Sequence, residues 1–344
     1  GYGELGRANL SLFDQKEFKT IFIPMNRGGI NFFKEIKSIY FFFYHIKKIK
    51  PDLVHLVTIK PYLYGGIASR LNNVPCLVSA ISGLGSLFIQ NNLKNKLLKL
   101  FIYFFYKFAF NHSNQKIIVQ NSDDAKFLVD WGVINSKKII LIKGSGVNLK
   151  NFKCLEEKDG PPVICFAARL LKDKGINEFI DAAEIIKKKG ISCFFLIAGD
   201  LDYQNPSAIS ARKLNRIKKK NSFRILGYVK DIPKLYAKSN IICLPSYREG
   251  LPKSLVEAAA ASRAIVTTDA PGCRDAVIPN KTGLLVPIKD SQKLADALLW
   301  LIEHPRERIK MGKAGRRLAE QEFAIEKIVK KHFQIYEELL NNIK

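Results

Sequence analysis

The sequence predicts an α/β protein with two doubly wound domains. Short apolar runs that are rich in branched residues alternate with helical patterning along most of the chain. Strands buried on both faces of a parallel sheet are nearly continuous in apolar residues, so this alternation is typical of parallel sheets covered by helices. The 344 residues also exceed the roughly 250–300 over which one core keeps growing. A polar segment at residues 148–162, ending in Gly-Pro-Pro, interrupts the pattern and favours a domain boundary there.

Four of the apolar runs precede this interruption and five follow it. The expected strands lie within residues 51–57, 75–81, 115–121, 137–143, 161–169, 193–199, 222–228, 240–246 and 264–269. We therefore expect an N-terminal domain over residues 1–150 and a second domain over residues 151–344, with the last helix packing back on the first domain. Ligands of open parallel sheets bind at the carboxyl ends of the strands, so the site is expected in a cleft between domains that face each other.

The composition describes a basic protein with enough apolar residues for two cores. There are 56 Lys and Arg against 31 Asp and Glu, a net charge of +25, and 47% of residues are hydrophobic. The charge indicates a polyanionic partner: nucleic acid, an acidic lipid surface or a diphosphate substrate. The basic runs at 187–189 and 218–220 lack the interleaved aromatics of a nucleic-acid reader, and solvated helix ends are the favoured interpretation of both.

The cysteines and the hydropathy pattern indicate a cytosolic protein. The six cysteines form no CxxC pair, and several lie in expected strands, so we interpret them as reduced core thiols and expect neither disulfides nor a metal site. No apolar run reaches the roughly 18 residues needed to span a bilayer, and no signal peptide is visible. The chain begins at Gly1 without a methionine, and we expect that N-terminal residues are missing.

The stretch SYREGLPKSLVEAAAAS, residues 246–262, carries the first chemical signal. It follows an expected strand, and Pro252 suits the first turn of a helix, so Glu249 precedes the helix and Glu257 lies about one turn inside it. Amides at a helix start bind phosphate oxygens, and Gly250 allows a close approach of the ligand. Carboxylates accept hydrogen bonds from sugar hydroxyls, so a nucleotide sugar accounts for acids beside an anion site. The alternative is a capping box formed by Ser254 and Glu257.

The segment at residues 166–183 adds positive charge to the same domain. Arg169 and Lys174 follow an expected strand and precede an amphipathic helix that begins near Asn177. Arg grips a diphosphate with its planar fork and Lys adds a point charge, so the two would stabilise a leaving nucleoside diphosphate. Ordinary solvated side chains are the alternative, and their position at a strand's carboxyl end favours the functional interpretation.

The segments ARLLKDKG and NKTGLLVP, together with residues 226–277, resemble the nucleotide-sugar domain of retaining family 4 glycosyltransferases of the GT-B fold. The resemblance extends from about residue 51 to the C-terminus. It implies that Glu249 lies near the donor sugar, that Glu257 binds the ribose hydroxyls, and that Arg169 and Lys174 bind the diphosphate. The resemblance thus implies that the catalytic residues are Glu249, Arg169 and Lys174. It implies that the donor is also bound by Glu257, Gly250, Leu251, Pro252 and Ser254.

Residues 55–88 resemble the acceptor domain of a narrower group, which transfers N-acetylhexosamines to undecaprenyl-diphosphate-linked sugars. This resemblance implies an acceptor side formed by Lys60, Ser82, Gly83 and Gly85, although the two glycines equally suit ordinary turns. The family opens with a strand, a glycine-containing loop and a helix that are absent or much altered in GYGELGR. One flank of the acceptor site is therefore expected to differ from the family.

The resemblance implies transfer of an N-acetylhexosamine from a UDP-sugar to a polyprenyl-diphosphate-linked acceptor, with retention and without cofactor or metal. In such front-face transfer, the leaving diphosphate helps to take the acceptor's proton. Two alternatives remain open, since fold alone does not determine function: a nucleotide-sugar 2-epimerase and a catalytically silent UDP-sugar-binding protein.

Two aromatic and lysine-rich segments suggest where the excess charge acts. Residues 91–110 and 32–50 suit helices that lie in a membrane interface, with lysines directed toward anionic headgroups. For residues 91–110 we favour the membrane, and for residues 32–50 a buried helix packed on the sheet. The expected location is therefore cytoplasmic and peripheral on the inner face of the plasma membrane, without a nucleic-acid partner.

Overall fold

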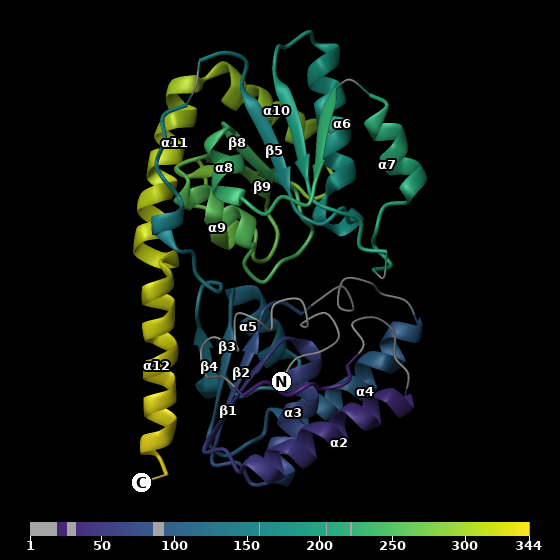
Figure 1. The fold of residues 1–344 in the computed structure, drawn as a ribbon, viewed down its shortest axis with the longest axis vertical. Helices are drawn as coiled ribbons and strands as arrows, with labels where there is room; N and C mark the ends of the chain where they lie inside the picture. The colour runs from purple at the N-terminus through teal and green to yellow at the C-terminus, as the bar shows by residue number, and fades with distance from the viewer. Residues whose placement is uncertain are drawn as a thin grey trace. The chain divides into compact units, whose positions relative to one another are not determined.

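The computed structural model describes residues 19–25, 32–84, 93–157, 159–203, 205–220 and 222–343 (Figure 1). The chain divides into two compact units. The first comprises Gly1–Val119, Ala125–Ile140 and Phe333–Lys344, and the second comprises Gln120–Asp124 and Leu141–His332.

The first unit contains a four-stranded sheet in the order β1-β2-β3-β4. Its strands are β1 (Leu53–Val57), β2 (Cys76–Ile81), β3 (Gln115–Val119) and β4 (Ile139–Leu141). Its helices are α2 (Phe32–Ile49), α3 (Ile59–Leu71), α4 (Leu93–Ala109), α5 (Ser122–Asp130) from Ala125 onward, and the end of α12 (Ile325–Asn341). β1 pairs in parallel with β2, and β2 with β3, so their carboxyl ends meet at one edge of the sheet.

Aromatic side chains form much of the core beneath this sheet. The rings of Tyr62, Tyr106 and Phe110 lie with their centroids 5.4–5.8 Å apart, and all three side chains are buried. At the C-terminus, the Tyr336 hydroxyl is hydrogen-bonded to His55 Nδ1 at 2.7 Å. Glu338 pairs with Lys116 at 2.6 Å, so the last turns of α12 are held on this unit.

The second unit contains a six-stranded sheet in the order β10-β9-β8-β5-β6-β7, parallel throughout. Its strands are β5 (Val163–Ala167), β6 (Phe194–Ala198), β7 (Phe223–Gly227), β8 (Ile241–Leu244), β9 (Ala264–Thr268) and β10 (Gly283–Val286). Its helices include α6 (Ile176–Lys188), α7 (Ala211–Lys218), α8 (Ile232–Ala237), α9 (Lys253–Ala260), α10 (Ser291–Glu303) and α11 (Pro305–Leu318). The chain runs outward from β5 to β7 and then returns to β8, so the strand order reverses between β5 and β8.

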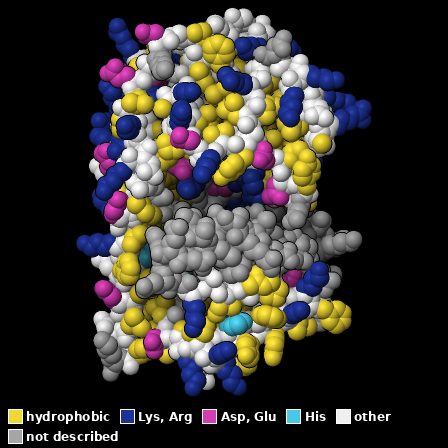
Figure 2. All heavy atoms as spheres, viewed as in Figure 1, with side chains coloured by type: hydrophobic (Ala, Val, Ile, Leu, Met, Phe, Trp, Pro, Cys, Tyr) yellow, Lys and Arg dark blue, Asp and Glu magenta, His cyan; other side chains and the backbone are white. Residues whose placement is uncertain are grey.

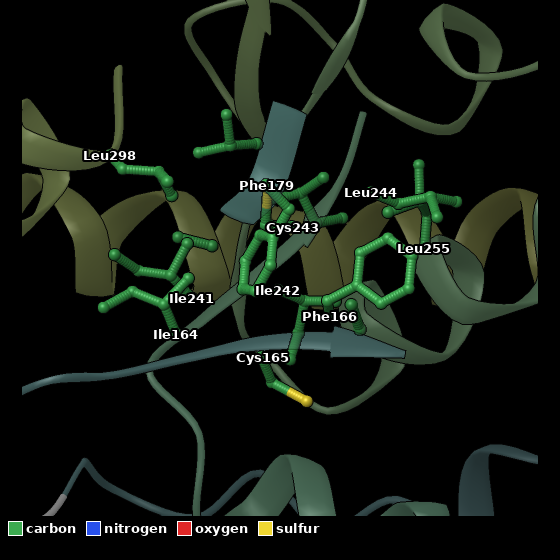
Figure 3. Packing of buried hydrophobic residues seen from close by; sticks show 14 of the residues in the cluster. Ile164, Cys165, Phe166, Phe179, Ile241, Ile242, Cys243, Leu244, Leu255 and Leu298 are labelled. Atoms are coloured by element: carbon green, nitrogen blue, oxygen red, sulfur yellow. The ribbon is translucent and has the colours of Figure 1, made fainter. Parts of the chain in front are cut away.

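The two central strands carry the core of this unit (Figure 3). Ile164, Cys165 and Phe166 of β5 are buried in the cluster that also contains the whole of β8, as the near-continuous apolar runs predict. Phe166 contacts Phe179 of α6, with ring centroids 5.4 Å apart. The six cysteines are free, and all except Cys154 are buried, which confirms the core position expected for most of them.

The structure confirms the expected architecture of two doubly wound α/β units with parallel sheets. Each of the nine expected strands is present, and β10 is a tenth that the apolar pattern alone did not predict. None of the described helices is long and apolar enough to cross a bilayer.

Candidate active site

The loops that follow β5 and β8 form the centre of the candidate site. These two strands are neighbours, and the strand order reverses between them. At such a switch point the loops on either side diverge to opposite faces of the sheet, which leaves a crevice at the carboxyl edge. Lys174 lies in the loop region after β5, and Glu249 lies in the loop after β8. The topology therefore brings together two predicted site residues from distant parts of the chain.

Lys174 and Glu249 form an ion pair. The Lys174 Nζ donates a hydrogen bond to Glu249 Oε1, and the two side chains are only 20% and 12% exposed. Lys174 ends a 3₁₀ helix (Lys172–Lys174), and α6 begins at Ile176, one residue before the expected start near Asn177. The site therefore presents a cation and a carboxylate side by side, in a partly buried setting that strengthens their interaction.

Gly175 determines how closely Lys174 approaches the loop after β8. Its φ is 73°, and a Cβ at this position would lie 2.0 Å from Pro245 O, closer than any real contact. A glycine is therefore required both by the backbone conformation and by the space available. The backbone at Gly175 therefore helps to position Lys174 beside Glu249, in addition to the ion pair that the Lys174 side chain forms.

Arg169 has a different partner. Its Nη1 donates to Asp202 Oδ2 at 2.5 Å, and the Arg169 side chain is 45% exposed. Asp202 follows β6, so Arg169 is held toward the neighbouring strand of the sheet. The structure therefore brings Lys174, but not Arg169, into direct contact with Glu249.

The helix after Glu249 begins without a capping box. α9 starts at Lys253, with Pro252 at its N-cap and no side-chain cap hydrogen bond. Ser254 lies inside the first turn, so it does not occupy the N-cap position that the capping-box alternative requires. The first-turn amides of a helix have no intrahelical acceptors, which leaves this end suited to bind an anion.

Glu257 lies on the next turn of α9, with its side chain 14% exposed. Burial raises the pKa of its carboxyl above the usual value, and the Lys253 ammonium, 3.6 Å away, partly opposes this effect. The ionised Glu257 carboxylate has little contact with water, and its one cationic neighbour is 3.6 Å away. It is therefore a strong hydrogen-bond acceptor for a ligand hydroxyl.

The backbone of Glu249 and Gly250 is held against two other segments of this unit. The Glu249 N–H donates to Pro271 O at 2.9 Å, and a Cβ on Gly272 would lie 2.4 Å from the carbonyl oxygens of Glu249 and Gly250. Gln120, which belongs to this unit, accepts a hydrogen bond from the Leu251 N–H at 3.0 Å. The Leu251 amide is thus already used, and the helix end rather than this amide is the candidate anion site.

Sequence reasoning missed Tyr247 and Asp173, which connect the two loops. The Ser246 hydroxyl and the Tyr247 N–H both donate to Asp173 O, at 3.0 and 2.9 Å. The Tyr247 hydroxyl donates to Glu178 Oε1 at 2.6 Å, and burial, with a smaller contribution from Glu178, raises the pKa of this phenol. The available signal was the position of Tyr247 two residues before Glu249 at a strand end. A tyrosine there reads equally well as a core residue.

A second Lys–Glu pair lies in the first unit. Lys60, in the first turn of α3, donates to Glu35 Oε1 at 2.5 Å, and the Tyr64 hydroxyl donates to Glu35 Oε2 at 2.6 Å. Burial raises the pKa of Tyr64, and its hydrogen bond to Glu35 adds to this rise. Thr58, between β1 and α3, has a φ of 74°, which is rare for a β-branched residue and marks local strain.

The other acceptor-side residues follow β2. Ser82 and Gly83 come directly after this strand, and the φ of Gly83 is 110°, a conformation that favours glycine. Gly85 lies outside the described residues. Among the described residues, no group of three or more His, Cys, Asp or Glu side chains is arranged to hold a metal ion.

The fold and the first site together define the class. Two parallel α/β units, with a carboxylate, a cation and an open helix start at the switch point of one sheet, are typical of doubly wound proteins that bind a nucleotide there. Residues 147–318 match the family model described as glycosyl transferases group 1, and residues 13–121 match that of glycosyl transferase 4-like proteins. The first match covers half of the chain, and the protein belongs to the group 1 glycosyl transferases.

Three relatives match most of the chain. An N,N'-diacetylbacillosaminyl-diphospho-undecaprenol alpha-1,3-N-acetylgalactosaminyltransferase of Campylobacter jejuni is 29% identical over 338 residues, 94% of this chain and 87% of the relative. A UDP-Gal:alpha-D-GlcNAc-diphosphoundecaprenol alpha-1,3-galactosyltransferase of Escherichia coli is 27% identical over 94% of this chain and 85% of its own length. The capsular polysaccharide biosynthesis glycosyltransferase CapM of Staphylococcus aureus is 28% identical over 88% of this chain and 80% of the relative.

Solved structures agree with the fold. A glycosyltransferase from Rickettsia africae superposes with a TM-score of 0.74 at 21% identity, covering 97% of this chain and 88% of that one. Anabaena HepE in complex with UDP and glucose gives 0.74 at 17% identity, covering 95% and 88%. The protein is a glycosyltransferase enzyme of the GT-B fold, and the transferase relatives do not support the epimerase alternative.

Proposed function

We propose that this glycosyltransferase moves an N-acetylhexosamine, with retention, from a UDP-sugar to a polyprenyl-diphosphate-linked sugar in bacterial polysaccharide or glycan assembly. The relatives named above act on diphosphoundecaprenol-linked acceptors or in capsule biosynthesis, which supports this acceptor class. The observation that carries the proposal is the Lys174–Glu249 pair at the switch point between β5 and β8. A UDP-sugar donor has an anionic diphosphate, which the lysine would bind, and a hydroxyl-rich sugar, which the carboxylate would bind.

In this proposal the donor's parts are divided among the groups of the second unit. Lys174, with Arg169, stabilises the negative charge that develops on the leaving diphosphate. Glu249 accepts hydrogen bonds from the donor sugar, and Glu257 accepts them from the ribose. The positive charge that stabilises the leaving diphosphate comes from these two basic side chains and the start of α9, so the proposed reaction uses no metal ion and no cofactor.

The acceptor's proton needs a base in this reaction. The proposed mechanism uses an oxygen of the leaving diphosphate, since the incoming hydroxyl approaches from the face that the diphosphate leaves. Lys174 would then act twice, first by favouring departure and then by holding the diphosphate beside the acceptor. The acceptor side is assigned to Lys60, Ser82 and Gly83 of the first unit, with Glu35 holding the lysine.

We further propose that the first unit meets the anionic inner surface of the plasma membrane through α4, where a lipid-linked acceptor is embedded. Leu100, Phe104 and Phe108 form a stripe at helical spacing that is 58%, 62% and 40% exposed. On α2, Phe42 and Ile46 are buried while Tyr40 and Tyr44 are exposed, so this helix combines a core face with an aromatic outer face. Figure 2 shows hydrophobic and basic side chains intermixed where α2 and α4 lie. Such a surface suits an interfacial contact.

The test is incubation of the protein with UDP-N-acetylhexosamine, with and without a polyprenyl-diphosphate-linked sugar. Transfer that requires the acceptor and gives a product with the donor's anomeric configuration is the expected result. Formation of an epimer without acceptor, or binding of UDP-sugar without turnover, would contradict the proposal. A screen of donors with product analysis then identifies the sugar and the linkage.

A further inference from the structure

Three basic side chains of the second unit converge on one surface concavity. Arg212 and Arg216 lie on α7 and Lys219 is its C-cap residue, so the three continue the helical spacing of four and three residues. Together with Asn215 they line an open pocket of about 470 Å³. All four side chains are exposed. The lining thus contains two guanidinium groups, one ammonium group and one amide, without a carboxylate.

The local sequence explains why these side chains face outward. Ser210 caps the helix by accepting a hydrogen bond from the Lys213 N–H at 3.2 Å, and Leu214 and Ile217 pack into the core of the unit. α7 contacts β7, the edge strand of the sheet (Figure 1). With its apolar side on the core, the helix presents the 212, 216 and 219 positions on the opposite side.

Two of the neighbouring lysines, Lys213 and Lys220, are hydrogen-bonded or ion-paired, whereas in the part of the chain that the structure describes these three side chains, like Lys218, are not. Lys213 Nζ donates to Asn177 Oδ1 at 2.7 Å, and Lys220 pairs with Glu184. Among the described residues, no carboxylate lies within ion-pair distance of the other three. Like charges one turn apart repel each other on a helix, so the arrangement is unfavourable until an anion occupies it.

We propose that Arg212, Arg216 and Lys219 form a site for the phosphate groups of anionic lipid headgroups. Guanidinium groups bind phosphate oxygens bidentately, and an exposed triad on a helix can contact a flat anionic surface. The phosphate chemistry rests on these side chains alone. The choice of a lipid headgroup rests on the proposed function, which places the substrate in a membrane. This contact would be electrostatic, in contrast to the apolar stripe of α4.

The chain offers a matched control on α11. Arg306, Lys310 and Lys313 have the same spacing of four and three residues and are also exposed. Lys310, however, pairs with Glu307 at 3.4 Å, and these side chains do not line the pocket beside α7. Changing either set of three residues to glutamine removes three positive charges. A difference in vesicle binding between the two variants therefore depends on where the charges lie and not on the net charge.

The experiment is co-sedimentation of the full chain with phosphatidylglycerol vesicles and with phosphatidylcholine vesicles, without donor or acceptor. Each basic residue near an anionic surface contributes about fivefold to binding. The R212Q/R216Q/K219Q variant should therefore bind phosphatidylglycerol roughly 100-fold more weakly, whereas R306Q/K310Q/K313Q should stay near wild type. The difference should shrink as salt rises, and neither variant should melt below wild type.

Equal losses in the two variants would show diffuse attraction by net charge and would overturn the proposal, as would no loss in either. If inorganic pyrophosphate at micromolar concentration abolished vesicle binding through the same residues, the site would serve a soluble phosphate compound instead of a lipid. RNA binding that depends on this triad, without vesicle binding, would also overturn it. A separate assay with a short-chain soluble acceptor tests the proposed transfer reaction. In that assay all variants should match wild type, so its failure would contradict the proposed function and not the lipid site.

Discussion

Each unit of the molecule contains a mostly buried Lys–Glu pair near the carboxyl edge of its sheet, Lys174–Glu249 in the second unit and Lys60–Glu35 in the first, and the two pairs are built differently. In the second unit, Lys174 and Glu249 are 20% and 12% exposed, and in the first, Lys60 and Glu35 are 23% and 13% exposed. The burial and the charges are thus nearly the same. What differs is the part of the fold from which each pair comes.

The pair of the second unit comes from two loops that follow adjacent central strands, β5 and β8. The pair of the first unit joins two helices, α2 and α3, beside the edge strand β1. A loop pair at a switch point is positioned by the backbone, whereas a helix pair depends on side-chain packing. We therefore expect changes near Lys174 to affect folding and chemistry together, and changes near Lys60 to affect mainly the binding of one substrate.

Gly175→Ala should have the largest effect. The new methyl would lie 2.0 Å from Pro245 O at a φ of 73°, so the loop after β5 must move away from the loop after β8. We expect the free energy of unfolding to fall by more than about 4 kcal/mol. Chemical denaturation monitored by circular dichroism measures this loss.

Gly190→Ala separates the steric clash at Gly175 from the strain of its backbone conformation. Gly190 has the same φ of 73°, but a Cβ there would meet nothing within 4 Å. Only the backbone strain of about 1–2 kcal/mol should remain. Equal losses for the two variants would show that the close approach to Pro245 contributes nothing.

Lys174→Gln should have the next largest effect, on the rate of transfer. Removing a charge that stabilises the leaving group lowers the rate more than it lowers donor affinity. We expect kcat to fall about 100- to 1,000-fold, while the donor Kd changes less than about tenfold. Arg169→Ala should act in the same direction but less strongly, because Arg169 is more exposed and pairs with Asp202.

Lys172→Gln is the matched control for Lys174→Gln, since Lys172 is an exposed lysine in the same 3₁₀ helix. It should keep turnover near wild type. If Lys174→Gln kept it too, the assignment of Lys174 to the diphosphate would be wrong.

The comparison of the two pairs also shows what the sequence can predict. Glu249 and Lys174 were each predicted because strand-end position and residue type are local properties of the chain. Their pairing was not, because the two residues are 75 positions apart and meet only through the adjacency of β5 and β8. Strand order depends on how the whole sheet assembles, and no local pattern encodes it.

Other features were missed for related reasons. Glu35 lies in an aromatic, lysine-rich helix whose pattern indicates packing or membrane contact, and its role follows only from its contacts with Lys60 and Tyr64. The strand β10, Gly283–Val286, has four residues, as many as the predicted strand β8, so its length does not explain why it was missed. Conversely, the long apolar runs that give β5 and β8 allowed the fold class to be predicted directly.

Glu257→Gln should reduce donor affinity and increase stability at neutral pH. If the carboxylate binds the ribose hydroxyls, its loss should weaken donor binding by about 1–3 kcal/mol, measured by titration calorimetry. Because burial raises the pKa of this carboxyl in the folded protein, its stabilising contribution is present below the usual pKa of 4.5 and lost as pH rises through the raised value. The glutamine variant should therefore melt above wild type at pH 7, with the difference vanishing below pH about 4.

A control for this prediction is Glu303→Gln, at the exposed end of α10, which should leave both quantities unchanged. Unchanged UDP affinity in Glu257→Gln would contradict the ribose assignment. A melting temperature lowered at pH 7 would contradict the effect of burial.

Glu35→Gln should have the smallest effect and should be confined to the acceptor. Glutamine keeps the shape of the side chain but loses the charge that holds the Lys60 ammonium at 2.5 Å, so the lysine would sample other orientations. We expect the KM for the lipid-linked acceptor to rise roughly tenfold, the loss expected for one charged hydrogen bond, with kcat at saturating acceptor and donor Kd within twofold of wild type. Glu338→Gln breaks the Lys116–Glu338 pair of the same unit, which is 2.6 Å long but has its carboxylate side chain 51% exposed, and should change none of these quantities. If Glu35→Gln lowered kcat and left the acceptor KM unchanged, Lys60 would not be held for the acceptor, and the functional difference between the two pairs would not hold.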